Sequence, residues 1–389
     1  MKEGRLVLIP KVDGEGQPKG YRPISLLGAF GKILEAVVEY RIKEELEEKG
    51  DLHGSQYGFR TGRSTIDAMR EVTITARKAT EKAAQHKDFC ALVTLDVRNA
   101  FNTARWSGII GALEHRKIDR HLIELVRSYL ANRSLLVGER GTVRLTCGVP
   151  QGSILGPLLW NLCYDDVFSV QVPDGVKIVG YADDLALVAV AKTGAILCHK
   201  INAAVADLTE HLHAKSLQIV PDKTEVVLLS GRRKLREITV SVGDTEVTSK
   251  RSLKYLGVHF DKDSRMTEHV RQTVARANEV AAKLSRLMPN VGGPRASKRR
   301  VICGAVTSIL LYGAPIWGAV IGMERYRGML LSAQRKLALR VGSAYRTVST
   351  EAALIVAGLV PIDLLVVERT RAYDTGEARD TLRRQTVAE

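Results

Sequence analysis

Two adjacent aspartates, Asp183 and Asp184, lie between two apolar runs of the chain, Val176–Gly180 and Leu185–Val190. Both runs are short and rich in Val, Ile and Leu, so we expect a hairpin that exposes the carboxylates at its tip. Two neighbouring anions repel each other without a counter-charge, and a divalent metal ion is the usual one. Because Asp-Asp is also an ordinary turn sequence, the pair alone does not decide between a turn and a metal site.

A third carboxylate points to the same chemistry. The run Phe89–Val97 is typical of a buried strand, and Asp96 lies near its C-terminal end. A carboxylate inside an apolar strand needs a partner or a metal ion. Aspartates on two adjacent strands can hold two cations, of which one activates an attacking hydroxyl and the other stabilises a leaving pyrophosphate. The alternative is a strand-end aspartate that is satisfied by ordinary hydrogen bonds.

The charge balance favours a polyanionic partner. The chain has 58 Lys and Arg against 43 Asp and Glu, a net charge of +15, which suits either nucleic acid or an anionic membrane surface. The segment Val301–Met323 is uncharged and follows Lys298-Arg299-Arg300, so its length permits a membrane span. Its glycines and Pro315 favour instead a buried helix that is interrupted near the proline, and we expect no membrane partner. The five cysteines form no Cys-x-x-Cys pair, and a reducing, intracellular compartment fits them.

A series of short motifs occurs in a fixed order along the chain. The central ones are Asp96-Val97-Arg98-Asn99-Ala100-Phe101, Gly148-Val149-Pro150-Gln151-Gly152-Ser153 and Tyr181-Ala182-Asp183-Asp184. Upstream and downstream of them lie Leu8–Lys11, Tyr21–Leu26, Gln56–Arg60, Lys223–Glu225, Lys254–Val258 and Leu311–Trp317. This ordered set resembles the reverse transcriptases of non-LTR (LINE-type) retrotransposons, especially the insect type-1 elements that insert into ribosomal DNA. The resemblance covers nearly the whole chain and implies a fragment of a longer Pol polyprotein.

The resemblance implies an α+β fold of the right-hand polymerase type. Residues 1–90 correspond to fingers, 91–262 to a palm with the catalytic carboxylates, 263–345 to a helical thumb and 346–389 to a C-terminal extension, which we expect to be frayed. In the palm, the residue pattern predicts helices on one face of a small antiparallel sheet. We expect Leu253–Phe260 to form one of its strands, and helices at Ala29–Glu48 and Glu268–Leu287.

The resemblance also assigns catalytic roles. Asp96 and Asp183 are expected to ligate the metal ions directly, with Asp184 as a weaker or outer ligand and the carbonyl of Val97 completing one metal shell. Lys223 corresponds to a lysine that acts as general acid for the leaving pyrophosphate. The loop before it, Leu217–Asp222, departs from the family pattern, which has more glycine and asparagine there.

Residues around the incoming nucleotide follow from the same resemblance. Lys11 and Arg22 correspond to cations that clamp the triphosphate, although either can be an ordinary surface cation. Phe101 corresponds to the aromatic residue that excludes a 2′-hydroxyl, and its alternative is a core aromatic. Gln151 and Gly152 are expected near the nucleotide and the template base, where glycine permits a close approach of the backbone.

The expected contacts with primer and template lie in three segments. Arg60 and Arg63 are predicted to contact the template backbone. The second segment resembles the primer grip and consists of Lys254, Tyr255, Leu256 and Gly257. The third is the expected thumb helix, whose cations either grip the duplex or form a solvated face; they are Arg271, Arg276, Lys283 and Arg286.

Together these expectations describe an RNA-directed DNA polymerase that extends a primer 3′-hydroxyl with dNTPs on an RNA template. Its cofactors would be two Mg²⁺ ions, with Mn²⁺ as an alternative, and its DNA partner a primer at a genomic target, so that it acts in the nucleus. The endonuclease that nicks the target would lie elsewhere in the parent polyprotein. Two alternatives stay open: a group II intron-type maturase, and a catalytically dead relic that only binds RNA. The intact Asp96, Asp183 and Asp184 argue against the second.

Overall fold

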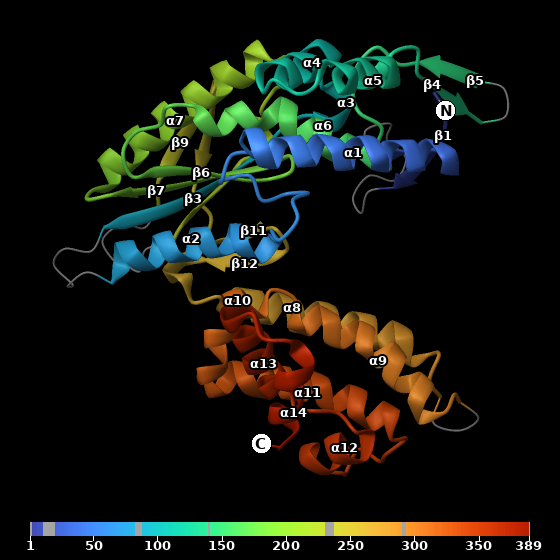
Figure 1. Cartoon of the computed structure of the whole chain (residues 1–389). Coiled ribbons are helices and arrows are strands. Elements are labelled where there is room, and N and C mark those ends of the chain that lie inside the picture. The colour runs from blue at the N-terminus through green and yellow to red at the C-terminus, as the bar shows by residue number, and fades with distance from the viewer. Residues whose placement is uncertain are drawn as a thin grey trace. The chain divides into compact units, whose positions relative to one another are not determined.

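The computed structural model describes residues 2–10, 20–81, 88–138, 141–229, 237–289 and 293–388 (Figure 1). Contacts divide the chain into two compact units. The first consists of Met1–Val72, Cys90–Val226 and Glu237–Ser249, and the second of Thr73–Phe89, Val227–Arg236 and Lys250–Glu389. The division into fingers, palm and thumb stays a prediction, because these contacts define only two units.

The sheet that carries the carboxylates has the strand order β6-β7-β3-β8. Its strands are β3 (Phe89–Asp96), β6 (Val176–Tyr181), β7 (Asp184–Ala191) and β8 (Glu225–Leu228). The expected hairpin is confirmed: β6 and β7 pair antiparallel, with Tyr181 opposite Asp184. The inner strands β7 and β3 are buried over most of their length, which explains why both appear in the sequence as nearly continuous apolar runs.

A second sheet of the first unit has the order β2-β1-β4-β5. Its strands are β1 (Glu3–Pro10), β2 (Tyr21–Leu26), β4 (Ser134–Val137) and β5 (Gly141–Arg144). Strand β1 pairs antiparallel with β2 and parallel with β4. A separate hairpin is formed by β9 (Thr239–Val242) and β10 (Thr245–Thr248).

Helices alternate with these strands along the chain. They are α1 (Ala29–Lys49), α2 (Thr65–Thr80), α3 (Ala100–Thr103), α4 (Trp106–His115), α5 (Arg120–Leu130), α6 (Leu155–Tyr164) and α7 (Gly194–Ala214), with short 3₁₀ turns at Asp165–Ser169 and Pro221–Lys223. Helix α6 is buried almost all round, as its largely apolar sequence requires. Helix α7 packs on β7. The helix expected at Ala29–Glu48 is confirmed as α1.

The second unit is mainly helical. It contains the hairpin β11 (Ser252–Tyr255) and β12 (Val258–Asp261), a 3₁₀ turn at Lys262–Ser264, and the helices α8 (Thr267–Ser285), α9 (Ala296–Leu311), α10 (Ala314–Trp317), α11 (Glu324–Val341), α12 (Thr350–Ala357), α13 (Ile362–Thr375) and α14 (Arg379–Ala388), with a 3₁₀ turn at Gly318–Gly322. Helices α8, α9 and α11 pack on one another, and α12 packs on α11. The helix expected at Glu268–Leu287 is thus confirmed, as α8.

Two expectations about this unit are wrong. The run Leu253–Phe260 is a hairpin and not one strand, because Leu256 and Gly257 both have positive φ, 45° and 89°, which is the backbone of a tight two-residue turn. The stretch expected to be frayed, 346–389, consists over its described residues mainly of the helices α12, α13 and α14. Its helix α13 buries Ile362, Leu365 and Val366, and this apolar face holds it against α10 and α11.

The uncharged segment Val301–Met323 is interrupted before Pro315. Helix α9 ends at Leu311, and Gly313, with φ of 67°, precedes α10. Pro315 lies in the first turn of α10, where its missing N–H costs nothing. The helix is only half-buried, since Val301 is 77% exposed. Among the described residues no single helix is long and apolar enough to cross a membrane, but two bent pairs pass by length and composition, Ala296–Leu311 with Ala314–Gly322 and Thr350–Ala357 with Ile362–Thr375.

Candidate active site

The turn between β6 and β7 places two of the carboxylates. Asp183 is at the tip and half-buried, and Asp184 is the exposed first residue of β7. Ala182, the other turn residue, has φ of 61°. A left-handed conformation is costly for a residue with a Cβ. The turn therefore needs neighbouring groups to hold it.

The three sequence-predicted carboxylates are close enough to influence one another. Burial raises the pKa of Asp183, and the charge of Asp96 raises it further, while Arg22 and Lys223 lower it. The pKa of Asp184 is raised to about 6 by burial, by Asp183 and by Asp96. Because Asp184 keeps much of its surface in solvent, we regard the repulsion by the two carboxylates as the decisive cause. This mutual repulsion favours a bound cation.

Backbone pairing brings Lys223 to the end of β3. The amide of Val220 donates to the carbonyl of Asp96 at 2.9 Å, and the 3₁₀ turn Pro221–Lys223 follows directly. The ammonium nitrogen of Lys223 then lies 2.8 Å from Oδ2 of Asp96. The two side chains are 62% and 36% exposed, so the pair itself contributes little to stability. Although its loop departs from the family pattern, Lys223 reaches the expected place beside the carboxylates.

The donor set fits a hard divalent cation, since carboxylate oxygens are the ligands that Mg²⁺ prefers. Asp96, Asp183 and Asp184 supply such oxygens, and burial together with the neighbouring carboxylates raises the pKa values of Asp183 and Asp184. Within the part of the chain that the structure describes, no three His, Cys, Asp or Glu side chains converge closely enough to hold a metal ion. Instead, the Asp96 carboxylate is engaged by Lys223. Val97, whose carbonyl was predicted to be a metal ligand, is buried and forms an antiparallel β-bridge with Ile219.

The structure describes most of the residues expected near the nucleotide. Arg22, exposed on β2, acts electrostatically on Asp183. Lys11 lies outside the described residues. Gly152 has φ of 104°, and a Cβ there would be 3.0 Å from the carbonyl oxygen of Ser25. The amide of Ser25 also donates to the carbonyl of Gln151 at 2.7 Å. Because Gly152 has no side chain and adopts a positive φ, the backbone at this position lies close to β2.

Phe101 is part of an aromatic cluster. Its half-buried ring stacks on Trp160, with centroids 5.1 Å apart, and meets the ring of Phe59 edge-on at 6.0 Å. These are the contacts that the core alternative implies. The role of Phe101 in sugar selection stays a prediction.

Residues 9–260 match the family model described as reverse transcriptase (RNA-dependent DNA polymerase). The chain belongs to this family. Membership implies divalent metal ions and a nucleic-acid template.

The relatives of this reverse transcriptase are proteins of insect retrotransposons of the non-LTR type. It is 30% identical to the putative 115 kDa protein in the type-1 retrotransposable element R1DM of Drosophila melanogaster, over 90% of this chain and 33% of that protein. It is 27% identical to the Pol polyprotein from the type-1 element R1 of Bradysia coprophila, over 90% of this chain and 35% of that protein. The reverse transcriptase thus spans about a third of the length of these curated relatives.

The fold is that of a solved polymerase. A telomerase from Candida tropicalis, in complex with a fragment of telomeric RNA, aligns with a TM-score of 0.51 over 99% of this chain and 64% of its own. The two sequences are 13% identical, so the likeness concerns the fold alone. The expected α+β fold of the right-hand polymerase type is confirmed.

In this reverse transcriptase, the two arginines expected to contact the template interact with nearby residues of their own segment. Arg60 donates to the carbonyls of His53 and Gln56 at 2.7 and 3.0 Å and pairs with Asp51. The guanidinium of Arg63 lies 5.3 Å from the centroid of the Tyr57 ring. Arg63 is exposed and keeps more freedom to reach a phosphate than Arg60 does. Contact with the template stays a prediction for both.

The residues resembling a primer grip lie on the β11–β12 hairpin. Lys254 is exposed and Tyr255 is buried, while Leu256 and Gly257 form the turn. The hydroxyl of Tyr312 binds this turn, a support that spacing alone does not reveal.

The four cations expected on the thumb helix, now α8, divide into two pairs. Arg271 binds Glu268 and the hydroxyl of Tyr326, and Lys283 pairs with Glu279. Arg276 and Arg286 are exposed. Whether either pair grips a duplex stays a prediction.

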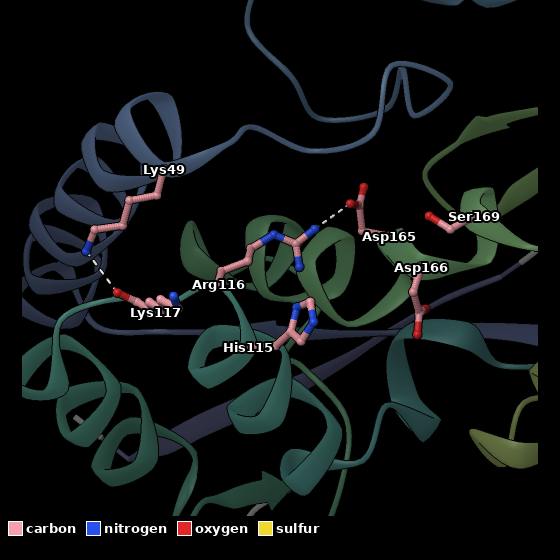
Figure 2. Close-up of a pocket in the computed structure, with 7 residues that line it drawn as sticks. All are labelled: Lys49, His115, Arg116, Lys117, Asp165, Asp166 and Ser169. Carbon is pink, nitrogen blue, oxygen red and sulfur yellow. Dashed lines mark hydrogen bonds and ion pairs between the residues drawn. The ribbon is translucent and has the colours of Figure 1, made fainter.

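A cavity of about 610 Å³ is lined by none of these residues. It is lined by Lys49, His115, Arg116, Lys117, Asp165, Asp166 and Ser169 (Figure 2). Arg116 pairs with Asp165 across it, and Lys49 donates to the carbonyl of Lys117. None of the sequence-predicted catalytic residues lines this cavity.

Two further residues were missed by sequence analysis. The side chains of Gln56 and Trp160 both bond the backbone of Ala182. Gln56 is the first residue of the motif Gln56–Arg60, but the spacing of the motifs along the chain does not connect it to the carboxylate turn.

Proposed function

We propose that this chain extends the 3′-hydroxyl of a primer with dNTPs on an RNA template, as the polymerase of a non-LTR retrotransposon. The observation that supports the proposal most directly is the approach of Lys223 to Asp96, beside the turn of Asp183 and Asp184. Three carboxylates with an adjacent proton donor are the groups that nucleotidyl transfer requires.

Each residue has a definite task in this proposal. Asp96 and Asp183 would hold two divalent ions, with Asp184 beside them; when bound, the ions activate the primer hydroxyl and stabilise the pyrophosphate. Lys223 stores a proton at Nζ and would donate it to that pyrophosphate. Arg22, whose charge lowers the pKa of Asp183, would bind the triphosphate through its planar guanidinium. The nucleus, a nicked genomic target and an endonuclease elsewhere in the parent polyprotein belong to this proposal as well.

Primer extension by the purified chain tests the proposal. A DNA primer annealed to RNA should be extended with dNTPs and Mg²⁺, and Asp183→Asn should lower kcat by roughly three orders of magnitude or more, because metal positioning supplies most of the catalysis. Asp244→Asn, an exposed turn carboxylate remote in sequence, is the matched control and should retain full activity. Equal extension by wild type and Asp183→Asn would refute the site. RNA binding without any extension by wild type would instead favour the relic.

A further inference from the structure

The side chain of Gln56 is fully buried and bonds the carboxylate turn from outside its hairpin. Its Oε1 accepts hydrogen bonds from the amides of Ala182, at 3.1 Å, and Gly58, at 3.0 Å. Its Nε2 donates to the carbonyl of Ala182 at 3.4 Å. Gln56 has no exposed surface. These hydrogen bonds fix the orientation of the buried Gln56 amide, because leaving any of the buried polar groups unpaired is unfavourable.

Ala182 is the residue that needs this support. Its positive φ is unfavourable for a side chain larger than hydrogen, and Asp183 follows it directly. The indole N–H of Trp160 donates to the same carbonyl at 3.2 Å. Both backbone polar groups of Ala182 are therefore bound by side chains, which compensates for the strained conformation.

The backbone on either side of Gln56 also contacts the carboxylate turn and the strand before it. The amide of Tyr57 donates to the carbonyl of Gly180 at 2.8 Å, and the amide of Gly180 donates to the carbonyl of Ser55 at 2.9 Å. A Cβ at Gly58 would lie 2.1 Å from the nitrogen of Ala182, so only glycine fits there. The segment thus pairs in parallel with the end of β6 and brings Gln56 against the turn.

We propose that Gln56 is a positioning residue that fixes the carboxylate of Asp183 by clamping Ala182 in its left-handed conformation. It acts through the backbone and contacts neither substrate nor metal. This inference rests on the proposed function, because it concerns the same site. Without the clamp, Ala182 relaxes toward negative φ, and the direction of the Asp183 side chain changes with it.

The chain offers a matched control for the loss of a buried glutamine. Gln334 on α11 is also buried, donates to the carbonyl of Val360 at 2.7 Å and accepts from the amide of Ile362 at 2.8 Å. Gln56→Met and Gln334→Met each remove a buried amide of similar size and bonding. Both variants should lower the melting temperature, and assays are run at a temperature where each is folded.

Three measurements separate positioning from general destabilisation. For Gln56→Met, kcat of primer extension should fall about 100-fold, as expected for a misplacement of about 1 Å, while the Kd for primer–template changes less than about twofold. Binding of Mn²⁺, followed by electron paramagnetic resonance without substrate, should weaken about tenfold or more. Gln334→Met should leave kcat and Mn²⁺ binding within about twofold of wild type.

A second substitution tests the mechanism of the clamp. Glycine adopts positive φ without strain, so Ala182→Gly in the Gln56→Met background should recover part of the lost kcat and Mn²⁺ affinity. Equal effects of Gln56→Met and Gln334→Met on Mn²⁺ binding would overturn the inference, as would a Kd for primer–template that rises in step with the loss of kcat. Failure of the proposed function looks different, because the wild type would then not extend primers, and the Mn²⁺ comparison would still decide the role of Gln56.

Discussion

The hydroxyl of Tyr312 donates a hydrogen bond to the carbonyl oxygen of Leu256 at 2.8 Å. The next residue, Gly257, has φ of 89°, and a Cβ there would lie 2.7 Å from the Tyr312 ring. The indole of Trp317 in turn donates to the carbonyl of Tyr312 at 2.7 Å. The segment Leu311–Trp317 thus supports the turn that resembles a primer grip.

Replacing Gly257 with alanine should damage this support more than removing the hydroxyl does. Tyr312→Phe loses one hydrogen bond, so the free energy of unfolding should fall by about 1 kcal/mol. Gly257→Ala combines positive φ with a steric clash and should cost about 1–3 kcal/mol. Urea unfolding measures both, with Tyr345→Phe, whose ring is 84% exposed, as the control. A fully stable Gly257→Ala would show that the turn does not depend on Tyr312.

Stability should depend on His269 between about pH 6.5 and pH 4. Burial, together with the charges of His259 and Lys254, lowers the pKa of this buried imidazole from 6.5 to about 4, although Tyr312 and Asp261 oppose the shift. Above pH 6.5 both states are neutral at this position. As the pH falls below that value, the unfolded chain takes up the proton and the folded one does not, so stability is lost by about 3 kcal/mol at pH 4.

Unfolding titrations at several pH values check this prediction. His269→Gln should flatten the decline between pH 6.5 and pH 4, whereas His213→Gln, an exposed histidine, should leave it unchanged. A decline of the same steepness in His269→Gln would assign the pH dependence to other groups.

Phe101→Val separates the two roles of the aromatic ring. If the ring contacts the sugar, the ratio of kcat/KM for rNTPs to that for dNTPs should rise, because space opens at the 2′ position. Loss of the contacts with Trp160 and Phe59 should also lower the free energy of unfolding, by about 1–2 kcal/mol for a half-buried ring. Phe30→Val, at a ring that is 82% exposed, is the control. A destabilised variant with unchanged sugar preference would make Phe101 a core residue only.

The salt dependence of primer–template binding should distinguish the cations of α8. Each lost phosphate contact reduces the slope of log K against log salt by about 1. The double variant Arg276→Gln/Arg286→Gln removes two exposed cations outside the ion pairs described above and should flatten the slope by about 2. Arg271→Gln/Lys283→Gln removes cations that are paired within α8 or with Tyr326 and should change it less. Identical slopes in wild type and both variants would place the duplex on another surface.

The local elements of the site were predictable because their signals are short-range. The apolar runs around Asp183 and Asp184 predict two strands, and the strand that carries Asp96 is recognisable in the same way. The run Leu253–Phe260 was misread because leucine is not a usual turn residue. The left-handed conformation of Leu256 is stabilised by the hydrogen bond that its carbonyl oxygen accepts from the hydroxyl of Tyr312.

The sequence by itself determined the family and the chemical identity of the site, since ordered motifs and carboxylates between apolar runs are properties of the chain as written. Only the tertiary structure decided which groups meet. Lys223 reaches Asp96 across 127 residues, and Gln56 reaches Ala182 across 126. Hydrophobic periodicity records which face of an element is buried, but it does not record the partner against which that face is packed. Contacts between side chains and distant backbone groups therefore depend on how the strands and helices assemble.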